Sequence, residues 1–186
     1  MSGKEMFTDI LEKGEKIIKV YKPNKKRFYL GVNLAMLLTT VFCVAWIPLL
    51  YLDSEIPRRV IHTIFLIAAI AVPIIWVITI LFARLYYKNR WYAYTNRRIL
   101  IRGGIIGIDF KSLQLGDLNA TKVYVSWIDK IFMQSRTGTI RFGSPSAPLV
   151  ETANGASNPY AFGHIEKPYD IMRDIREYID TSVNKK

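Results

Sequence analysis

The sequence predicts a pair of membrane-spanning helices followed by a small α+β domain, in which short antiparallel strands are closed by one C-terminal helix. Two runs without Lys, Arg, Asp or Glu occupy residues 28–52 and 60–83. After Trp91 the hydrophobic period changes from helical to two, which is typical of strands. Of the 186 residues, about one hundred follow the second run, and that is room for one small domain.

Both uncharged runs are long enough to cross a bilayer. They contain 25 and 24 residues, and at about 1.5 Å per residue each exceeds the roughly 30 Å of a hydrocarbon core. A core helix of a soluble protein would carry a polar face, and a cleaved signal peptide would have a shorter run with a small-residue cleavage site. The sequence therefore predicts two spanning helices that the mature protein keeps.

The short connection between the runs predicts an antiparallel helical hairpin. Only residues 53–59, with Pro57, join them, so both chain ends lie on one side of the membrane. Lys and Arg number eight in residues 1–27, two in the connection and six in residues 84–103. By the positive-inside rule we expect a cytoplasmic leader (1–27), a transmembrane hairpin (28–83) and a cytoplasmic domain (84–186).

The charge balance favours a membrane surface as the partner. The formal charge of +11 divides into +4 in residues 1–27, zero in the connection and +7 in residues 84–186. Each Lys or Arg near a membrane contributes about 1 kcal/mol of attraction to anionic headgroups, so we expect membrane lipid rather than nucleic acid. The alternative is that these charges only orient the helices.

Basic residues beside the two runs are the candidate site residues. Those predicted to lie at the membrane interface are Lys25, Lys26, Arg27, Arg84, Lys88 and Arg90. Those predicted to contact anionic lipid from the rim of the domain are Arg97, Arg102 and Lys111. For Arg98 we favour a structural role, tying a hairpin to a carboxylate or to carbonyl groups, whereas for Arg97 both roles stay open.

Local patterns place the elements of the domain. A weak helix is expected at 1–11 and a short strand at 16–21, which we expect to pair with the domain. Further strands are expected at 91–95, 98–102, 105–110, 111–115, 122–127, 139–142 and 160–162, a helical turn at 128–132, an irregular loop at 143–158, and a helix from Pro168 to about Thr181.

Several short motifs, in their order around the helix pair, resemble a known family. They are residues 92–101 (YAYTNRRILI), 138–142 (GTIRF) and 162–165 (FGHI), with a leader at 14–23. Together they resemble the membrane-bound bacterial pleckstrin-homology-like (PH-like) domains, over about residues 14–180. The resemblance implies a PH-like small β-barrel or sandwich capped by its C-terminal helix, in the plasma membrane of a bacterium. It implies no particular ligand, because PH-like domains bind lipids or partner proteins.

The sequence indicates binding rather than catalysis. His62 and His164 lie far apart and Cys43 is within the first run, so we expect no metal site and no cofactor. The first hypothesis is a non-enzymatic membrane-anchored module that binds or senses envelope lipid or a partner protein, as a monomer or a homo-oligomer. The alternative is an accessory subunit of a transport or peptide-resistance assembly, because the small residues Ala68, Ala69 and Ala71 could pack against other membrane helices.

Overall fold

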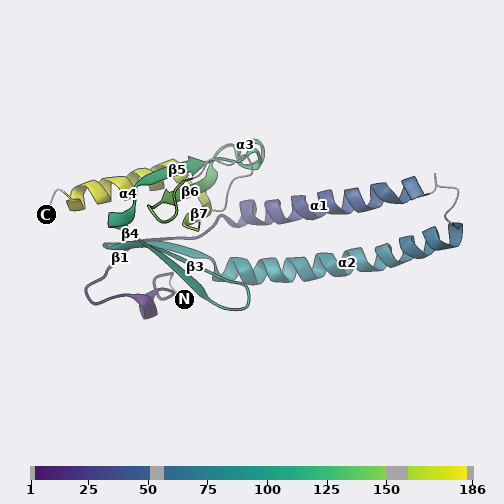
Figure 1. Cartoon of the computed structure of the whole chain (residues 1–186), viewed down its shortest axis with the longest axis horizontal. Helices are drawn as coiled ribbons and strands as arrows, with labels where there is room; N and C mark the ends of the chain where they lie inside the picture. Colours follow the sequence, from purple (N-terminus) through teal and green to yellow (C-terminus); the bar gives the residue numbers. More distant parts are fainter. Residues whose placement is uncertain (1–2, 51–56, 150–158, 184–186) are drawn as a thin grey trace. The chain divides into compact units, whose positions relative to one another are not determined.

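The computed structural model describes residues 3–50, 57–149 and 159–183 of the chain (Figure 1). The chain divides into two compact units, one formed by residues 29–85 and the other by residues 1–28 together with 86–186. We call the second unit the domain. Parts of the predicted connection, 53–56, and of the predicted long loop, 150–158, lie outside the described residues.

Two long apolar helices supply the unit of residues 29–85. Helix α1 spans Lys25–Leu50 and α2 spans Arg58–Asn89. Helix α1 begins before the predicted run, and α2 begins before and ends after its own run, because polar residues at these borders continue the helical backbone. Both Lys25–Trp46 and Arg58–Asn89 are long and apolar enough to cross a membrane. The indole Nε1 of Trp76 donates a hydrogen bond to Thr40 Oγ1 at 3.0 Å, which joins the two helices.

The domain contains two antiparallel sheets. The first has the order β1-β2-β3-β4 and comprises β1 (Ile17–Tyr21), β2 (Trp91–Thr95), β3 (Arg98–Gly103) and β4 (Asp109–Gln114). The second has the order β5-β6-β7 and comprises β5 (Ala120–Tyr124), β6 (Thr137–Gly143) and β7 (Ala161–Glu166). The predicted pairing of the leader strand with the domain is confirmed, because Val20 lies opposite Ala93.

Two helices and two short 3₁₀ turns complete the described part of the domain. Helix α3 spans Trp127–Phe132 and α4 spans Pro168–Val183, while the turns η1 and η2 span Thr8–Ile10 and Leu115–Asp117. Helix α4, drawn in yellow in Figure 1, packs against β5 and β6. Both the helical turn near 128–132 and the helix that starts at Pro168 agree with the sequence prediction. Of the weak helix expected at 1–11, only η1 is present among the described residues.

One predicted strand is wrong, and another has different bounds. The chain forms a turn between β3 and β4 where a strand was expected at 105–110. Gly104 has φ +114°, and a Cβ atom there would lie 2.0 Å from the carbonyl oxygen of Gly107, so the turn requires glycine. The strand expected at 122–127 ends at Tyr124 instead, because Ser126 and Asp129 form a capping box that starts α3.

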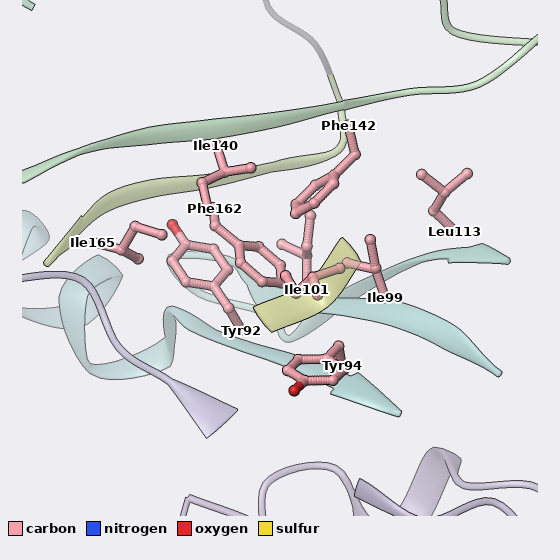
Figure 2. Packing of buried hydrophobic residues seen from close by; sticks show 10 residues of the cluster. Tyr92, Tyr94, Ile99, Ile101, Leu113, Ile140, Phe142, Phe162 and Ile165 are labelled. Atoms are coloured by element: carbon pink, nitrogen blue, oxygen red, sulfur yellow. The ribbon is translucent and has the colours of Figure 1, made fainter. Parts of the chain in front are cut away.

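The main core lies between the two sheets and α4. Tyr92, Phe142 and Phe162 are at most 1% exposed, and the Phe162 ring packs 4.8 Å from that of Tyr92 and 4.9 Å from that of Phe142 (Figure 2). Figure 2 also shows Ile99, Ile101 and Leu113 of the first sheet together with Ile140 and Ile165 of the second. Burial of these large side chains from both sheets holds the domain together.

A second cluster covers the other face of the first sheet. Phe7, Ala93 and Leu100 are at most 1% exposed there, and Met6 and Leu11 of the leader pack against them. The central strands β2 and β3 are therefore buried on both faces, and the leader is part of the domain.

Candidate functional site

Within the domain, the first turn of α1 lies beside the last turn of α2. The Phe28 ring packs against the rings of Tyr86 and Tyr87, with centroids 5.8 and 5.5 Å apart. The Tyr87 hydroxyl donates a hydrogen bond to the carbonyl oxygen of Pro23 at 3.1 Å. The chain therefore leaves the domain for α1 and returns from α2 at neighbouring points.

A buried ion pair fixes the first of these points. Arg27 is 4% exposed, and its Nε lies 2.5 Å from Asp129 Oδ1 of α3. Asp129 also accepts hydrogen bonds from the hydroxyls of Ser126 and Thr137. Burial opposes the charged carboxylate, but the hydrogen bonds from Arg27, Ser126 and Thr137 outweigh it and hold the pKa of Asp129 below its usual value. This corrects the expected headgroup role of Arg27, whose guanidinium is buried inside the domain.

A basic cleft of about 920 Å³ opens next to Thr137. Its walls come from the segment between β1 and α1, the segment after α3, the end of β7 and the start of α4. Among the described residues that line it are five cationic side chains and a single carboxylate. They are Lys22, Lys25, Lys26, Arg136, Lys167 and Glu166. Glu166 accepts a hydrogen bond from the Asn24 side-chain amide, and its single negative charge offsets only one of the five positive charges in this lining.

The neighbouring cations of the cleft affect the pKa of Lys22. Partial burial, and then the charge of Lys25, lower the pKa of the Lys22 ammonium. Its Nζ lies 4.7 Å from the ring centroid of Tyr87 and 4.3 Å from that of Trp91. An anion in the cleft would offset the repulsion, and phosphate suits lysine and arginine donors because it accepts several charged hydrogen bonds.

His164 lies close to the cleft in the left-handed region, with φ 55°. Its carbonyl oxygen accepts a hydrogen bond from the backbone of Asn24 at 2.6 Å, and its ring meets the edge of Phe28. Burial, and then the charge of Arg27, lower the pKa of His164 to about 4. At neutral pH the imidazole is therefore uncharged and adds nothing to the positive charge of the cleft.

Comparison with known proteins identifies the family of the chain. Residues 31–169 match the family described as Bacterial PH domain, and this is well over half of the chain. The chain belongs to the bacterial PH domain family. The resemblance drawn from the sequence motifs is thereby confirmed. Neither the curated proteins nor the solved structures contain a match to the chain.

The family match begins inside α1 and therefore leaves out the leader. In this bacterial PH domain, β1 and the ion-pairing Arg27 come from the chain before residue 31. Strand β1 nevertheless completes the first sheet, and its residues Val20 and Tyr21 contribute to one wall of the cleft.

The residues predicted for the membrane interface have different surroundings. Lys25, Lys26, Arg84 and Lys88 are exposed. Arg90 is partly buried, donates a hydrogen bond to the Tyr92 hydroxyl at 2.9 Å, and lies over the Tyr86 ring at 5.0 Å. Contact of these residues with headgroups stays a prediction.

The residues predicted to contact anionic lipid from the rim do not form one cluster. Arg97 lies in the turn after β2, whereas Arg102 lies at the opposite end of the β2–β3 hairpin, across from Trp91. Arg97 pairs with Glu12 at 3.2 Å. The Arg102 guanidinium lies over Phe110, and its buried Nε has no hydrogen-bond partner among the described residues. Lys111 is exposed on β4.

Arg98 has the structural role that we favoured from the sequence. Its Nη2 lies 2.9 Å from Glu15 Oε2 and donates to the carbonyl oxygen of Ile10 at 2.8 Å. Sequence reasoning missed Lys22, Arg136 and Lys167 as site residues. The one local signal was that each is a basic residue in a connection, with Lys22 directly after a predicted strand and Lys167 directly before a predicted helix.

Proposed function

We propose that this bacterial PH domain protein is a non-enzymatic membrane-anchored module, and that its basic cleft binds the phosphate-bearing headgroup of an anionic lipid. In this proposal α1 and α2 form an antiparallel hairpin in the plasma membrane, with the domain on the cytoplasmic side. The packing of Phe28 against Tyr86 supports the hairpin, because it holds the start of one helix beside the end of the other. The distribution of Lys and Arg supports the cytoplasmic side.

The observation that carries the proposal is that the cleft and the first turn of α1 share two residues. Lys25 and Lys26 line the cleft and also form the first turn of α1. When α1 spans the membrane, its first turn lies at the headgroup layer, and the cleft opens where lipid phosphates are concentrated. Each cation near the surface contributes about 1 kcal/mol of attraction, so the five cations together favour an anionic lipid over a neutral one.

Native mass spectrometry of the full chain in mild detergent tests the proposal. The probes are phosphatidylglycerol and phosphatidylcholine with the same acyl chains, and the wild type is expected to retain more phosphatidylglycerol. In the variant Lys22→Gln, Arg136→Gln, Lys167→Gln, the loss of three cations should weaken this retention by up to about a hundredfold. Inorganic phosphate as a competitor separates recognition of the phosphate group from recognition of the whole lipid.

A matched control removes the same charge elsewhere. The variant Lys13→Gln, Lys16→Gln, Arg173→Gln changes exposed residues that do not line the cleft, and it should retain phosphatidylglycerol as the wild type does. Equal loss in both variants would show a general charge effect and no cleft site. Equal retention of both lipids by the wild type would count against a lipid ligand. The accessory-subunit alternative would gain if the chain co-purified in mild detergent with a heterologous membrane protein in fixed stoichiometry.

A further inference from the structure

Two apolar elements project from the domain surface. In the turn between β3 and β4, Ile105, Ile106 and Ile108 are 42%, 92% and 55% exposed. On α3, Trp127, Ile131 and Phe132 are 56%, 65% and 52% exposed. Single exposed apolar side chains are common on protein surfaces, but clusters of large ones mark a surface that contacts something apolar.

The turn is tied to the last turn of α2. The Asn89 amide donates a hydrogen bond to the carbonyl oxygen of Gly104 at 3.3 Å. The register of the hairpin agrees, because Trp91, which follows α2, lies opposite Arg102 at the end of β3. Gly104 approaches Gly107 too closely for any side chain, so the turn is tight, and the hydrogen bond from Asn89 holds its start beside the point where α2 ends.

Helix α3 is tied in the same way to the first turn of α1. Arg27 pairs with Asp129, and its Nη2 donates to the Ser126 hydroxyl at 2.9 Å. Since Ser126 caps α3 and Asp129 lies within it, the whole short helix is anchored to the start of α1. Because Phe28 packs on Tyr86, the two anchoring points are neighbours, and the two apolar elements are attached on either side of them.

We infer that the turn at residues 105–108 and the exposed side of α3 insert, as a pair of apolar wedges, into the interface of the membrane that α1 and α2 span. The inference rests on the membrane placement proposed above and is independent of the lipid preference of the cleft. The bilayer is the occupant that the structure favours, because each wedge is attached to a point where a spanning helix joins the domain. Exposed cations accompany these points, namely Lys25, Lys26 and Lys88, with Lys130 on α3, as expected for groups that meet headgroups.

Burial depth measured by nitroxide labelling tests the inference. The full chain is reconstituted in nanodiscs of phosphatidylglycerol and phosphatidylcholine. One sample carries the label on native Cys43, and three others carry it after Ile106→Cys, Ile131→Cys or Asn96→Cys on a Cys43→Ala background. Power saturation compares access of oxygen, which enters the acyl layer, with access of a water-soluble nickel chelate. Ile106, Ile131 and Asn96 are exposed, so the labels lie outside the core. Asn96→Cys also removes two side-chain hydrogen bonds to the leader, at Lys16 and Gly14.

Oxygen access should exceed nickel access at positions 43, 106 and 131, with the reverse at position 96. Nickel access at 106 and 131 together with a buried label at 43 would overturn the wedges and leave the proposed membrane placement standing. Nickel access at 43 would overturn that placement and the wedges with it. Labels at 106 and 131 that are shielded from both reagents would show that a protein surface, such as a second copy of the chain, covers the wedges, and this too would overturn the inference.

Discussion

The two ends of the β2–β3 hairpin have opposite chemistry. At the end that carries Asn96, the cations meet carboxylates of the leader, because Arg98 pairs with Glu15 at 2.9 Å and Arg97 pairs with Glu12 at 3.2 Å. At the other end, the turn after Gly103 presents isoleucines, of which Ile106 is 92% exposed. At one end the cations are neutralised by ion pairs, whereas the other end exposes large apolar side chains.

This difference assigns a role to the leader beyond covering the first sheet. By supplying Glu12, it pairs with Arg97, which the sequence offered as a candidate lipid contact, and by supplying Glu15 it pairs with Arg98, for which the sequence favoured a structural role. The cations of the cleft lie at the opposite end, where the leader leads into α1 and offers lysines instead. The domain thus has a polarity along the hairpin, because its cationic cleft and its exposed isoleucines lie at the end that carries the first turn of α1 and the last turn of α2.

Removal of the buried carboxylate of Asp129, which pairs with Arg27 in the first turn of α1, should have the largest effect. Asp129→Ala leaves the Arg27 guanidinium buried and unpaired, and we expect a loss of about 3–5 kcal/mol in the free energy of unfolding. Unfolding of the full chain in mild detergent, followed by tryptophan fluorescence, measures it. The control is Asp174→Asn, which breaks the exposed pair with Lys19 and should cost less than about 1 kcal/mol. Similar losses in the two variants would contradict the buried pair.

Acid should destabilise the domain beside the first turn of α1, because His164 packs there against Phe28. Its pKa is about 4 in the folded chain against an ordinary value of 6.5. The unfolded chain therefore binds the proton more readily, and stability is lost as the pH falls from about 6.5 to about 4, by about 3 kcal/mol in total. The pKa values of Glu15 and Asp129 are lowered, so their stabilisation is lost only below their ordinary values, in a more acidic window.

The variant His164→Asn removes the imidazole and so separates its contribution to the pH dependence from those of Glu15 and Asp129. Asparagine is the replacement because it tolerates the left-handed backbone at this position. Unfolding measured between about pH 7 and about pH 4.5 should show a flatter pH dependence in the variant than in the wild type. An unchanged slope would assign the acid sensitivity to other groups.

At the far end, Glu15→Gln should have an intermediate effect. The Glu15 side chain is fully buried and receives hydrogen bonds from Arg98 and Thr95. A neutral amide weakens these charged hydrogen bonds, so we expect a loss of about 1.5–3 kcal/mol in the same fluorescence measurement. Glu12→Gln is the matched control, since Glu12 is 52% exposed in its side chain, and it should change stability by less than about 1 kcal/mol. Equal effects would show that burial does not distinguish the two carboxylates.

The smallest effect is expected from Arg97→Gln. Its pair with Glu12 is half exposed on both sides, so stability should change by less than about 1 kcal/mol. Because Arg97 lies at the end of the hairpin away from the cleft, retention of phosphatidylglycerol in native mass spectrometry should stay at the wild-type level. A clear drop in retention would return Arg97 to the residues that contact lipid, as the sequence first predicted.

The sequence by itself determined the features that depend on neighbouring residues. Uncharged runs of sufficient length predicted two long apolar helices, and the period of two predicted β2 at 91–95. Pro168 marked the start of α4, because proline fits the first turn of a helix and little else in a regular element. The order of short motifs was enough to indicate the family.

Only the tertiary structure decided which charges are paired and which stay free. Arg27 and Lys26 are adjacent in the sequence, yet Arg27 is buried against Asp129 of α3 while Lys26 is exposed at the cleft. Lys22, Arg136 and Lys167 likewise come together only when β1, α3 and β7 are assembled. Electrostatic interactions depend on distance and burial in space, and separation along the chain specifies neither.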